Sequence, residues 1–337
     1  MKIFFLYLLT KTDKSENVHW MKSFLTALQE RTCCMTSKTN NFKSGFIAVV
    51  GRTNVGKSTL LNALLGQKIS IVSEKPQTTR NNIRLIRTTE SSQMIFIDTP
   101  GFHKPKSKLS TFMLDSATSS VKDVDLVLFL VEEDNAIGKG DQMLLDKLAG
   151  CNVPVILVIN KIDRIPKEQL LAKIALYQKY DFIKEIVPIS AVKNENTDTL
   201  VEIIEKYLPD GVQYFPEDML TDRAERFVIQ EIIREKLLHY LRDEVPHATA
   251  VEVSQMKENE TRHFVNIEAT IYCERKSHKG IIIGKNGSML KRIGIASRKD
   301  IEEMLDAKVN LSLWVKVREG WREKDFDLKD LGYTEKE

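Results

Sequence analysis

The eight residues from Gly51 to Ser58 have the types and spacing of a phosphate-binding loop. They read Gly-Arg-Thr-Asn-Val-Gly-Lys-Ser, which matches G-x-x-x-x-G-K-[ST]. In this pattern the backbone N–H groups of a glycine-containing turn surround phosphate oxygens, Lys57 reaches the β- and γ-phosphates, and Ser58 ligates Mg²⁺. The mechanism requires a strand before the loop and a helix after it. The apolar run Phe46–Val50 and the helical spacing of Ser58–Leu65 predict both.

Three further polar elements each follow a predicted buried strand. The strands are Met94–Ile97, Val155–Ile159 and Ile186–Ile189, and the elements that follow them are Asp98-Thr-Pro-Gly101, Asn160-Lys-Ile-Asp163 and Ser190-Ala191. Ligands of open α/β sheets bind outside the carboxyl ends of the strands, so we expect all of these elements to form one site. There Asp98 would hold Mg²⁺ through water, and the Gly101 N–H would meet the γ-phosphate.

Asp163 indicates which base is bound. Its carboxylate can accept two hydrogen bonds from guanine, one from N1–H and one from the exocyclic amino group. Adenine has neither donor and would leave the carboxylate unpaired, which such a site rejects strongly. The residues therefore favour a guanine nucleotide over the alternative of a P-loop ATPase or kinase.

The segment Glu74–Arg80 lies between the first two motifs and contains Thr78 and Thr79. A threonine here can ligate Mg²⁺ while the γ-phosphate is present and leave after hydrolysis, which would make the segment a switch. The alternative is an ordinary proline-containing loop with surface threonines.

Strands and helices alternate as far as Tyr207, which is typical of an α/β protein with a mostly parallel sheet. The remaining expected elements of this part are a strand over Leu126–Val131 and helices over Gln142–Leu148, Leu170–Tyr180 and Leu200–Tyr207. The alternation ends at Leu208–Asp222, which contains two prolines and a glycine. We therefore expect a poorly ordered extension over residues 1–43, a nucleotide-binding domain over 44–210, a linker over 211–222 and a smaller α+β domain over 223–337.

The second domain contains a G-x-x-G loop, Gly284-Lys-Asn-Gly287, within a basic stretch. From Glu274 to Asp300 there are eight lysines and arginines against two acids. The expected order of elements is a helix (Arg223–Leu241), two strands (Ala250–Gln255 and Phe264–Cys273), two helical segments around Gly284 to Leu305 and a strand (Val309–Val317). That order resembles the type II KH fold, in which such a loop holds the backbone of about four nucleotides of single-stranded RNA. The expected RNA contacts are Gly284, Lys285, Asn286, Gly287, Lys291 and Arg292.

Taken together, the motifs resemble those of the bacterial Era GTPases, from about residue 45 to the C-terminus. The resemblance implies a P-loop GTPase of the α/β class with a mostly parallel sheet, followed by a smaller α+β domain of the KH type. It implies GTP or GDP and Mg²⁺ as ligands and the 3′ end of small-subunit ribosomal RNA as partner. It also implies a role in maturation of the small ribosomal subunit.

The same resemblance implies the site residues. Those expected to act in hydrolysis are Lys57, Thr79 and Gly101, and those expected to hold the metal are Ser58, Thr79 and Asp98. The expected nucleotide contacts are Gly51, Arg52, Thr53, Asn54, Val55, Gly56, Lys57, Ser58, Thr59, Asp98, Thr99, Pro100, Gly101, Phe102, Asn160, Lys161, Ile162, Asp163, Ser190 and Ala191. Phe102 stands where Ras-type GTPases carry a water-orienting glutamine, which suggests slow intrinsic hydrolysis.

Composition limits the alternatives. The 337 residues are 42% hydrophobic and 29% charged, with a net charge of +3, and no apolar run approaches the ~18 residues needed to span a bilayer. The four cysteines show no metal-binding or disulfide spacing, so we expect a reducing cytoplasm. We also expect the protein to be a monomer. Two other hypotheses remain. One is an RNA-binding protein with a vestigial nucleotide domain, and the intact Lys57, Ser58, Asp98 and Asp163 argue against it. The other is a signalling GTPase recruited to the inner face of the cell membrane, supported only by the apolar run Ile3–Leu9.

We predict that K⁺ accelerates GTP hydrolysis more than Na⁺ does. No glutamine follows Gly101, so positive charge near the β- and γ-phosphates has to come from elsewhere, and such charge can raise the rate about 10³-fold. In GTPases that this chain resembles, an asparagine at the position of Asn54 helps to hold a potassium ion. The alternative is that Asn54 only favours the backbone conformation of the loop. GTP turnover in matched KCl and NaCl, for the parent and Asn54→Ala, decides between them. Equal parent rates in both salts would show that K⁺ plays no part in hydrolysis. A K⁺ effect that survives in Asn54→Ala would show that Asn54 does not bind the ion.

Overall fold

The computed structural model describes residues 42–73, 75–102, 107–121, 123–132, 136–259 and 264–333. Nearly all of the expected N-terminal extension lies outside these ranges, and so does the run Ile3–Leu9. The poor order of the extension and the membrane recruitment that Ile3–Leu9 would support therefore stay predictions, as do the domain bounds. Among the described residues, no helix is long and apolar enough to cross a membrane.

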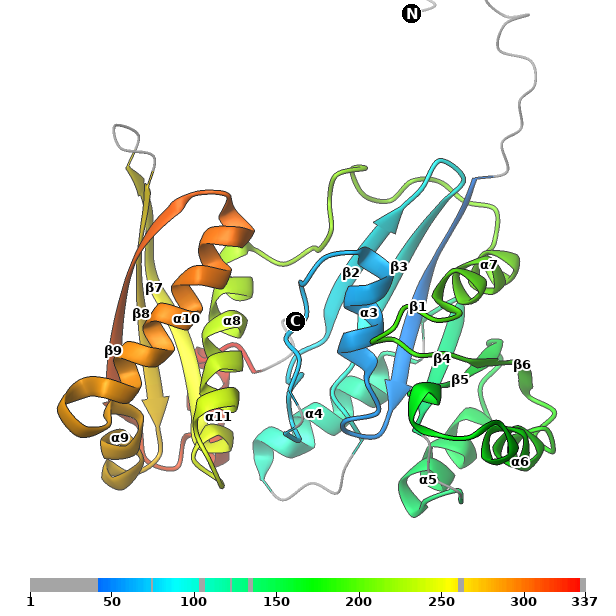
Figure 1. Ribbon diagram of the computed structural model, residues 1–337, viewed down its shortest axis with the longest axis horizontal. Coiled ribbons are helices and arrows are strands. Elements are labelled where there is room, and N and C mark those ends of the chain that lie inside the picture. The colour runs from blue at the N-terminus through cyan, green and yellow to red at the C-terminus, as the bar shows by residue number, and fades with distance from the viewer. Residues whose placement is uncertain are drawn as a thin grey trace, which may run out of the picture. The chain divides into compact units, whose positions relative to one another are not determined.

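The first part of the described chain forms a six-stranded sheet (Figure 1). Its strands are β1 (Lys43–Gly51), β2 (Ile83–Thr88), β3 (Ser92–Asp98), β4 (Leu126–Val131), β5 (Val155–Ile159) and β6 (Ile183–Pro188), in the order β2-β3-β1-β4-β5-β6. All neighbours are parallel except β2 and β3. Every residue of β4 and β5 is buried, as expected for apolar strands covered on both faces. The expected α/β class with a mostly parallel sheet is confirmed.

Five helices cover this sheet, α3 (Lys57–Leu65), α4 (Lys108–Ser119), α5 (Lys139–Leu148), α6 (Lys167–Tyr177) and α7 (Thr197–Tyr207). The apolar side chains of α3 and α7 share one core cluster with one face of the sheet, and those of α4, α5 and α6 share the cluster on the other face.

The sequence did not predict β2 or α4. The α4 segment is rich in serine and threonine, which disfavour helix interiors. Its N-terminus is closed by a capping box between Ser107 and Ser110.

The second part is built on a three-stranded sheet of β7 (Thr249–Asn259), β8 (Phe264–Cys273) and β9 (Lys308–Val317). β7 and β8 are antiparallel, whereas β8 and β9 are parallel. The helices α8 (Glu225–Tyr240), α9 (Lys276–Ile283) and α10 (Ser288–Leu305) bury their apolar side chains against one face of it. The observed order α8-β7-β8-α9-α10-β9 is the expected one. A final helix, α11 (Asp325–Asp330), was not expected from the sequence.

A fully buried arginine joins the two parts. Arg80 follows Thr79 and is 1% exposed. Its guanidinium donates to the carbonyl oxygens of Thr249 and His247 at 2.7 and 3.0 Å. The guanidinium carbon lies 5.8 Å from the ring centroids of both Trp321 and Tyr333, whose rings stack on each other. Burying a guanidinium is costly unless acceptors pair with its N–H groups, and here both terminal nitrogens of Arg80 have such partners. Arg80 therefore anchors the threonine segment in the second part of the chain.

We predict that Arg80→Ala lowers the free energy of unfolding by about 3 kcal/mol, because it removes several buried hydrogen bonds and the aromatic stacking. Arg84→Ala is the matched control. Arg84 is half exposed, and its ion pair with Asp222, at 3.4 Å, should contribute less than about 1 kcal/mol. Denaturant unfolding of both variants measures the difference. Equal losses of stability in the two variants would contradict the anchoring role of Arg80.

Candidate nucleotide site and nucleic-acid interface

The glycine-containing loop leaves β1 and enters α3 through two left-handed backbone positions. Asn54 has φ 67° and Gly56 has φ 94°. Glycine adopts this region without a steric penalty and asparagine tolerates it. A Cβ at Gly56 would also lie 2.3 Å from the amide nitrogen of Asn160. The loop thus combines its turn with a close approach to the segment that follows β5.

Lys57 begins α3 and is almost fully buried. Its Nζ donates to the carbonyl oxygens of Gly51 and Arg52 at 3.2 and 2.9 Å. Burial lowers the pKa of Lys57 to about 8, although Asp98 and Glu132 act to raise it. The amine is still mostly protonated at pH 7 and is held over the loop, where a phosphate oxygen could replace the carbonyl groups as its partner.

Asp98, at the end of β3, is the meeting point of three hydroxyl groups. Its Oδ2 accepts from Ser58 at 2.9 Å, from Ser70 at 3.0 Å and from Thr79 at 3.4 Å. The hydroxyl oxygens of Ser58 and Thr79 also lie 3.1 Å apart, within hydrogen-bond distance. The Asp98 side chain is 0% exposed, and burial is the main cause that raises its pKa. Its other oxygen, Oδ1, is buried and has no hydrogen-bond partner among the described residues. The structure thus brings the three expected metal ligands together.

The segment after β5 is held by its own side chains. Asn160 donates to the Val55 carbonyl oxygen at 2.9 Å and accepts from the Ala191 N–H at 3.1 Å. Ser190 donates to Asp163 at 2.6 Å, and this hydrogen bond is the main cause that lowers the pKa of Asp163. Asp163 is therefore an ionised acceptor at neutral pH.

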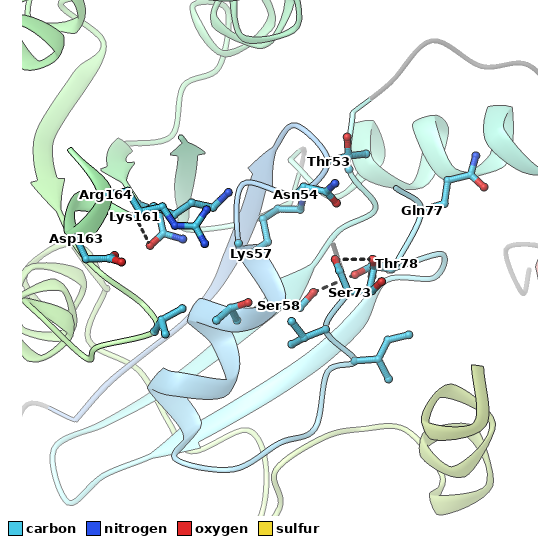
Figure 2. A pocket seen from close by; sticks show the side chains of 18 residues that line it. Thr53, Asn54, Lys57, Ser58, Ser73, Gln77, Thr78, Lys161, Asp163 and Arg164 are labelled. Atoms are coloured by element: carbon cyan, nitrogen blue, oxygen red, sulfur yellow. Dashed lines mark hydrogen bonds between the residues drawn. The ribbon is translucent and has the colours of Figure 1, made fainter. Parts of the chain in front are cut away.

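A cavity of about 540 Å³ runs between these groups. Lys161 and Asp163 lie at one end, Ser73 and Thr78 at the other, and Lys57 between them (Figure 2). Of the expected residues, it is lined by Thr53, Asn54, Gly56, Lys57, Ser58, Thr59, Thr79, Gly101, Asn160, Lys161 and Asp163. The other expected residues do not line it, namely Gly51, Arg52, Val55, Asp98, Thr99, Pro100, Phe102, Ile162, Ser190 and Ala191. The cavity brings together motifs that are up to about 110 residues apart in the sequence.

Several of the expected residues that do not line the cavity fix the position of the loops. Arg52 lies 3.1 Å from the buried carboxylate of Asp141 on α5. Thr99 donates to the Val49 carbonyl oxygen at 2.7 Å, and the Phe102 N–H donates to the Gly51 carbonyl oxygen at 3.2 Å. These contacts give the residues a role in shaping the loops rather than in lining the cavity.

Part of the cavity wall was not expected from the sequence. Ile71, Val72, Ser73, Gln77, Arg164 and Val192 also line it. Arg164 follows Asp163 directly, so its position next to a recognised motif was the available signal. Ile71, Val72, Ser73 and Gln77 belong to the irregular segment before Thr78, whose spacing carries no pattern.

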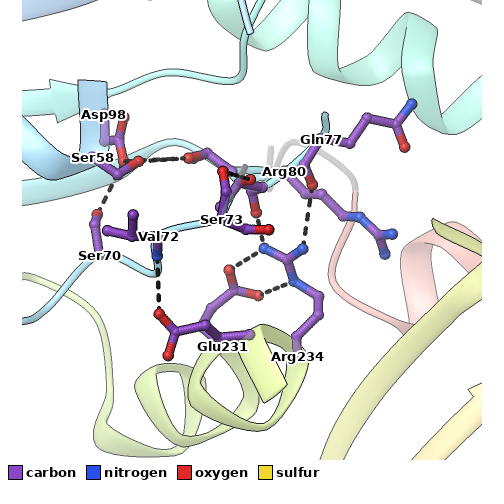
Figure 3. Close-up of polar contacts among 12 residues, drawn as sticks. Ser58, Ser70, Val72, Ser73, Gln77, Arg80, Asp98, Glu231 and Arg234 are labelled. Carbon is purple, nitrogen blue, oxygen red and sulfur yellow. Dashed lines mark hydrogen bonds and ion pairs between the residues drawn. The ribbon is translucent and has the colours of Figure 1, made fainter. Parts of the chain in front are cut away.

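Residues of α8 hold the segment that carries Thr79 (Figure 3). Arg234 donates to the carbonyl oxygens of Gln77 and Thr78 and pairs with Glu231 at 2.6 Å. Glu235, also on α8, accepts hydrogen bonds from the Val72 N–H at 3.1 Å and from Lys68 at 2.7 Å, which precede Gln77 in the same connection between α3 and β2. The second part of the chain therefore binds both neighbours of Thr79, namely Thr78 through Arg234 and Arg80 through Thr249 and His247.

The G-x-x-G loop joins α9 to α10. Gly284 and Gly287 have φ 74° and 75°, and Asn286 has φ 52°. A Cβ at Gly284 would lie 2.7 Å from that of Met289, whereas one at Gly287 would meet nothing within 4 Å. Lys285 and Lys291 are exposed, and Arg292 stacks on the ring of Tyr240 with its guanidinium carbon 4.4 Å from the centroid.

Beside this loop, α10 and β9 enclose a groove of about 340 Å³. Gly287 and Lys291 line it, together with Arg298, which was not among the expected contacts. Arg292 does not line the groove. The groove combines exposed cations with apolar side chains such as Leu290 and Leu311, which suits a chain of stacked bases with a phosphate backbone.

Comparison with known proteins agrees with this geometry. Residues 46–161 match the family model described as a 50S ribosome-binding GTPase, and residues 244–322 match that of the KH domain. The chain is 53% identical to the GTPase Era of Clostridioides difficile strain 630, over 88% of this chain and 100% of that protein. It is 56% identical to the GTPase Era of Clostridium beijerinckii, over 87% and 98%.

Two solved structures are also similar over nearly the same length. One is Era in complex with MgGDPNP and nucleotides 1506–1542 of 16S ribosomal RNA. It is 41% identical with a TM-score of 0.84 and covers 87% of this chain and 100% of that one. The other is an Era variant from Aquifex aeolicus bound to GDP and AlF₄⁻, 40% identical with the same TM-score and the same coverage. A GTPase family model and a KH domain in one chain, with relatives of this similarity over almost their full length, show that the chain belongs to the Era family of GTPases.

Proposed function

We propose that this GTPase binds the 3′ end of small-subunit ribosomal RNA through its KH domain and acts in maturation of the small ribosomal subunit. The observation that carries the proposal is the groove between α10 and β9, which opens beside the Gly284–Gly287 loop and is lined by Lys291 and Arg298. The similar Era structure in complex with MgGDPNP contains nucleotides 1506–1542 of 16S ribosomal RNA. A KH loop with adjacent cations fits that class of partner.

For the nucleotide, we propose GTP or GDP with Mg²⁺ in the cavity between Lys57 and Asp163. Ser58, Thr79 and Asp98 offer hard oxygen ligands, and the partnerless Oδ1 of Asp98 suits an acceptor for metal-bound water. Bound Mg²⁺ supplies charge that stabilises the transferring phosphoryl group. Lys57 places its ammonium against the phosphates, and the Gly101 N–H, in the loop that packs on Thr53, would face the γ-phosphate.

We further propose that the bases lie along the groove while Lys285 and Lys291 neutralise phosphates. Gly287 has open space above it and lets the RNA backbone approach closely. Arg298 is added to the expected contacts because it lines the groove. Arg292 would contact RNA only by leaving its place on Tyr240.

The experiment is binding of the full chain to a single-stranded RNA with the sequence of the 16S 3′ end, in the presence of a non-hydrolysable GTP analogue. A scrambled RNA of equal length is the control. We expect at least about tenfold tighter binding to the ribosomal sequence at physiological salt, together with co-sedimentation with small ribosomal subunits. Equal affinity for both RNAs and no co-sedimentation would contradict the proposal.

We predict that Asp163→Asn moves base preference from guanine toward xanthine. Xanthine carries a carbonyl where guanine carries its exocyclic amino group, and an asparagine amide can donate to that carbonyl. The preference for GTP over XTP should fall by about 100-fold or more. Competition binding with the two nucleotides measures it, and Asp210→Asn, outside the cavity, is the control. Unchanged discrimination in Asp163→Asn would show that Asp163 does not read the base.

We predict that Gly287→Asp weakens RNA binding by about tenfold or more and leaves GTP binding unchanged. The carboxylate would stand where the RNA phosphates approach and would repel them. Gly287→Asn is the matched control because it has the same size and the same strained φ but no charge. RNA titration of both variants separates the two effects. Equal RNA affinities of Gly287→Asp and the parent would mean that the loop is only a turn.

A further inference from the structure

A serine outside all the nucleotide motifs contacts the carboxylate at the metal position. Ser70 lies in the irregular segment between α3 and β2, and it is 1% exposed. Its hydroxyl donates to Asp98 Oδ2 at 3.0 Å, as close as the expected ligand Ser58 at 2.9 Å (Figure 3). Ser70 does not line the nucleotide cavity. It therefore reaches the reaction only through Asp98.

Ser70 is itself fixed by a side chain of α3. Asn62 donates to the Ser70 carbonyl oxygen at 2.7 Å. Its amide oxygen accepts from the N–H groups of Ile69 and Ser70 at 3.0 and 2.9 Å. Three hydrogen bonds from one amide leave the Ser70 backbone little freedom, because they satisfy both of its polar groups. Asn62 belongs to α3, the helix that begins with Lys57 and Ser58. The same helix therefore holds two of the donors to Asp98, Ser58 directly and Ser70 through Asn62.

The carboxylate needs such support. The last torsion of an aspartate side chain is broad, so hydrogen bonds have to define the direction of its two oxygens. Ser58, Ser70 and Thr79 all donate to Oδ2, and this arrangement leaves Oδ1 free of partners among the described residues. Ser58 and Thr79 are expected to turn toward the metal, whereas Ser70, fixed from behind by Asn62, can stay on Oδ2.

We propose that Ser70 and Asn62 are positioning residues for the metal site, which orient Asp98 so that Oδ1 faces the Mg²⁺-bound water. The inference rests on the proposed metal site of Ser58, Thr79 and Asp98. It adds two residues that contact neither nucleotide nor metal, and it assigns them to Mg²⁺ affinity rather than to nucleotide affinity. Loss of such an outer partner typically lowers metal affinity or activity 10–100-fold.

The test is the Mg²⁺ concentration that half-maximally slows release of fluorescent GDP, measured for the full chain without any turnover. In Ser70→Ala we expect this midpoint to rise about tenfold, while GDP affinity in EDTA equals that of the parent. Ser92→Ala is the matched control. Ser92 is also 1% exposed and donates to a carboxylate, that of Glu205 at 2.5 Å, away from the cavity. Its midpoint should equal that of the parent.

Asn62→Asp provides a second route if Ser70→Ala does not fold. The new carboxylate keeps the acceptor for both N–H groups but sets an oxygen against the Ser70 carbonyl, so Ser70 should shift and the midpoint should rise. If Ser70→Ala does fold, the two rises should be less than additive in free energy in the double variant Ser70→Ala/Asn62→Asp, because both act through Asp98.

The outcomes separate the inference from the proposed function. A parent whose GDP release does not respond to Mg²⁺ would overturn the metal site itself. A responsive parent, with Ser70→Ala and Asn62→Asp at the midpoint of Ser92→Ala, would overturn only the positioning role.

Discussion

The buried carboxylate of Asp98 is the constraint around which the nucleotide site is arranged. A carboxylate with no exposure is costly unless donors surround it. Its three donors come from the start of α3 and from two places in the segment between α3 and β2. One charge therefore requires the start of α3 and both of these places to converge at the end of β3. Lys57, also buried, lies near enough to favour the ionised form of Asp98.

The same convergence connects the cavity to the second part of the chain. Thr79 contributes one of the three donors, and the residues on either side of it are bound elsewhere. Arg234 holds the Thr78 carbonyl oxygen, and Thr249 and His247 hold the guanidinium of Arg80. If Thr79 moves away from Asp98, these contacts have to stretch, break or move with it. Thermodynamic reciprocity then requires that anything which alters those contacts also alters the position of Thr79.

The α4 helix provides a second connection. Leu109 and Met113 of α4 share a buried cluster with Ala250, Trp321 and Tyr333. The α4 helix follows Asp98–Gly101 in the sequence, as the Thr79 segment follows the phosphate loop. Both segments next to the expected γ-phosphate position thus pack on the same C-terminal residues. The aromatic rings of Trp321 and Tyr333 take part in both contacts, since the guanidinium of Arg80 also lies against them.

The sequence by itself determined the parts of this protein that rest on local chemistry. The phosphate loop, the segment Asn160–Asp163 and the buried strands β4 and β5 could be predicted because spacing along the chain sets their backbone and periodicity sets their burial. The expectation of a guanine base rests on the one carboxylate of Asp163. Only the tertiary structure decided which residues support them. Ser70, Asn62, Arg234 and the burial of Arg80 carry no local pattern, because each acts through a partner 8 to about 170 residues away. A side chain whose role depends on such a partner looks like any other polar residue until the fold supplies that partner.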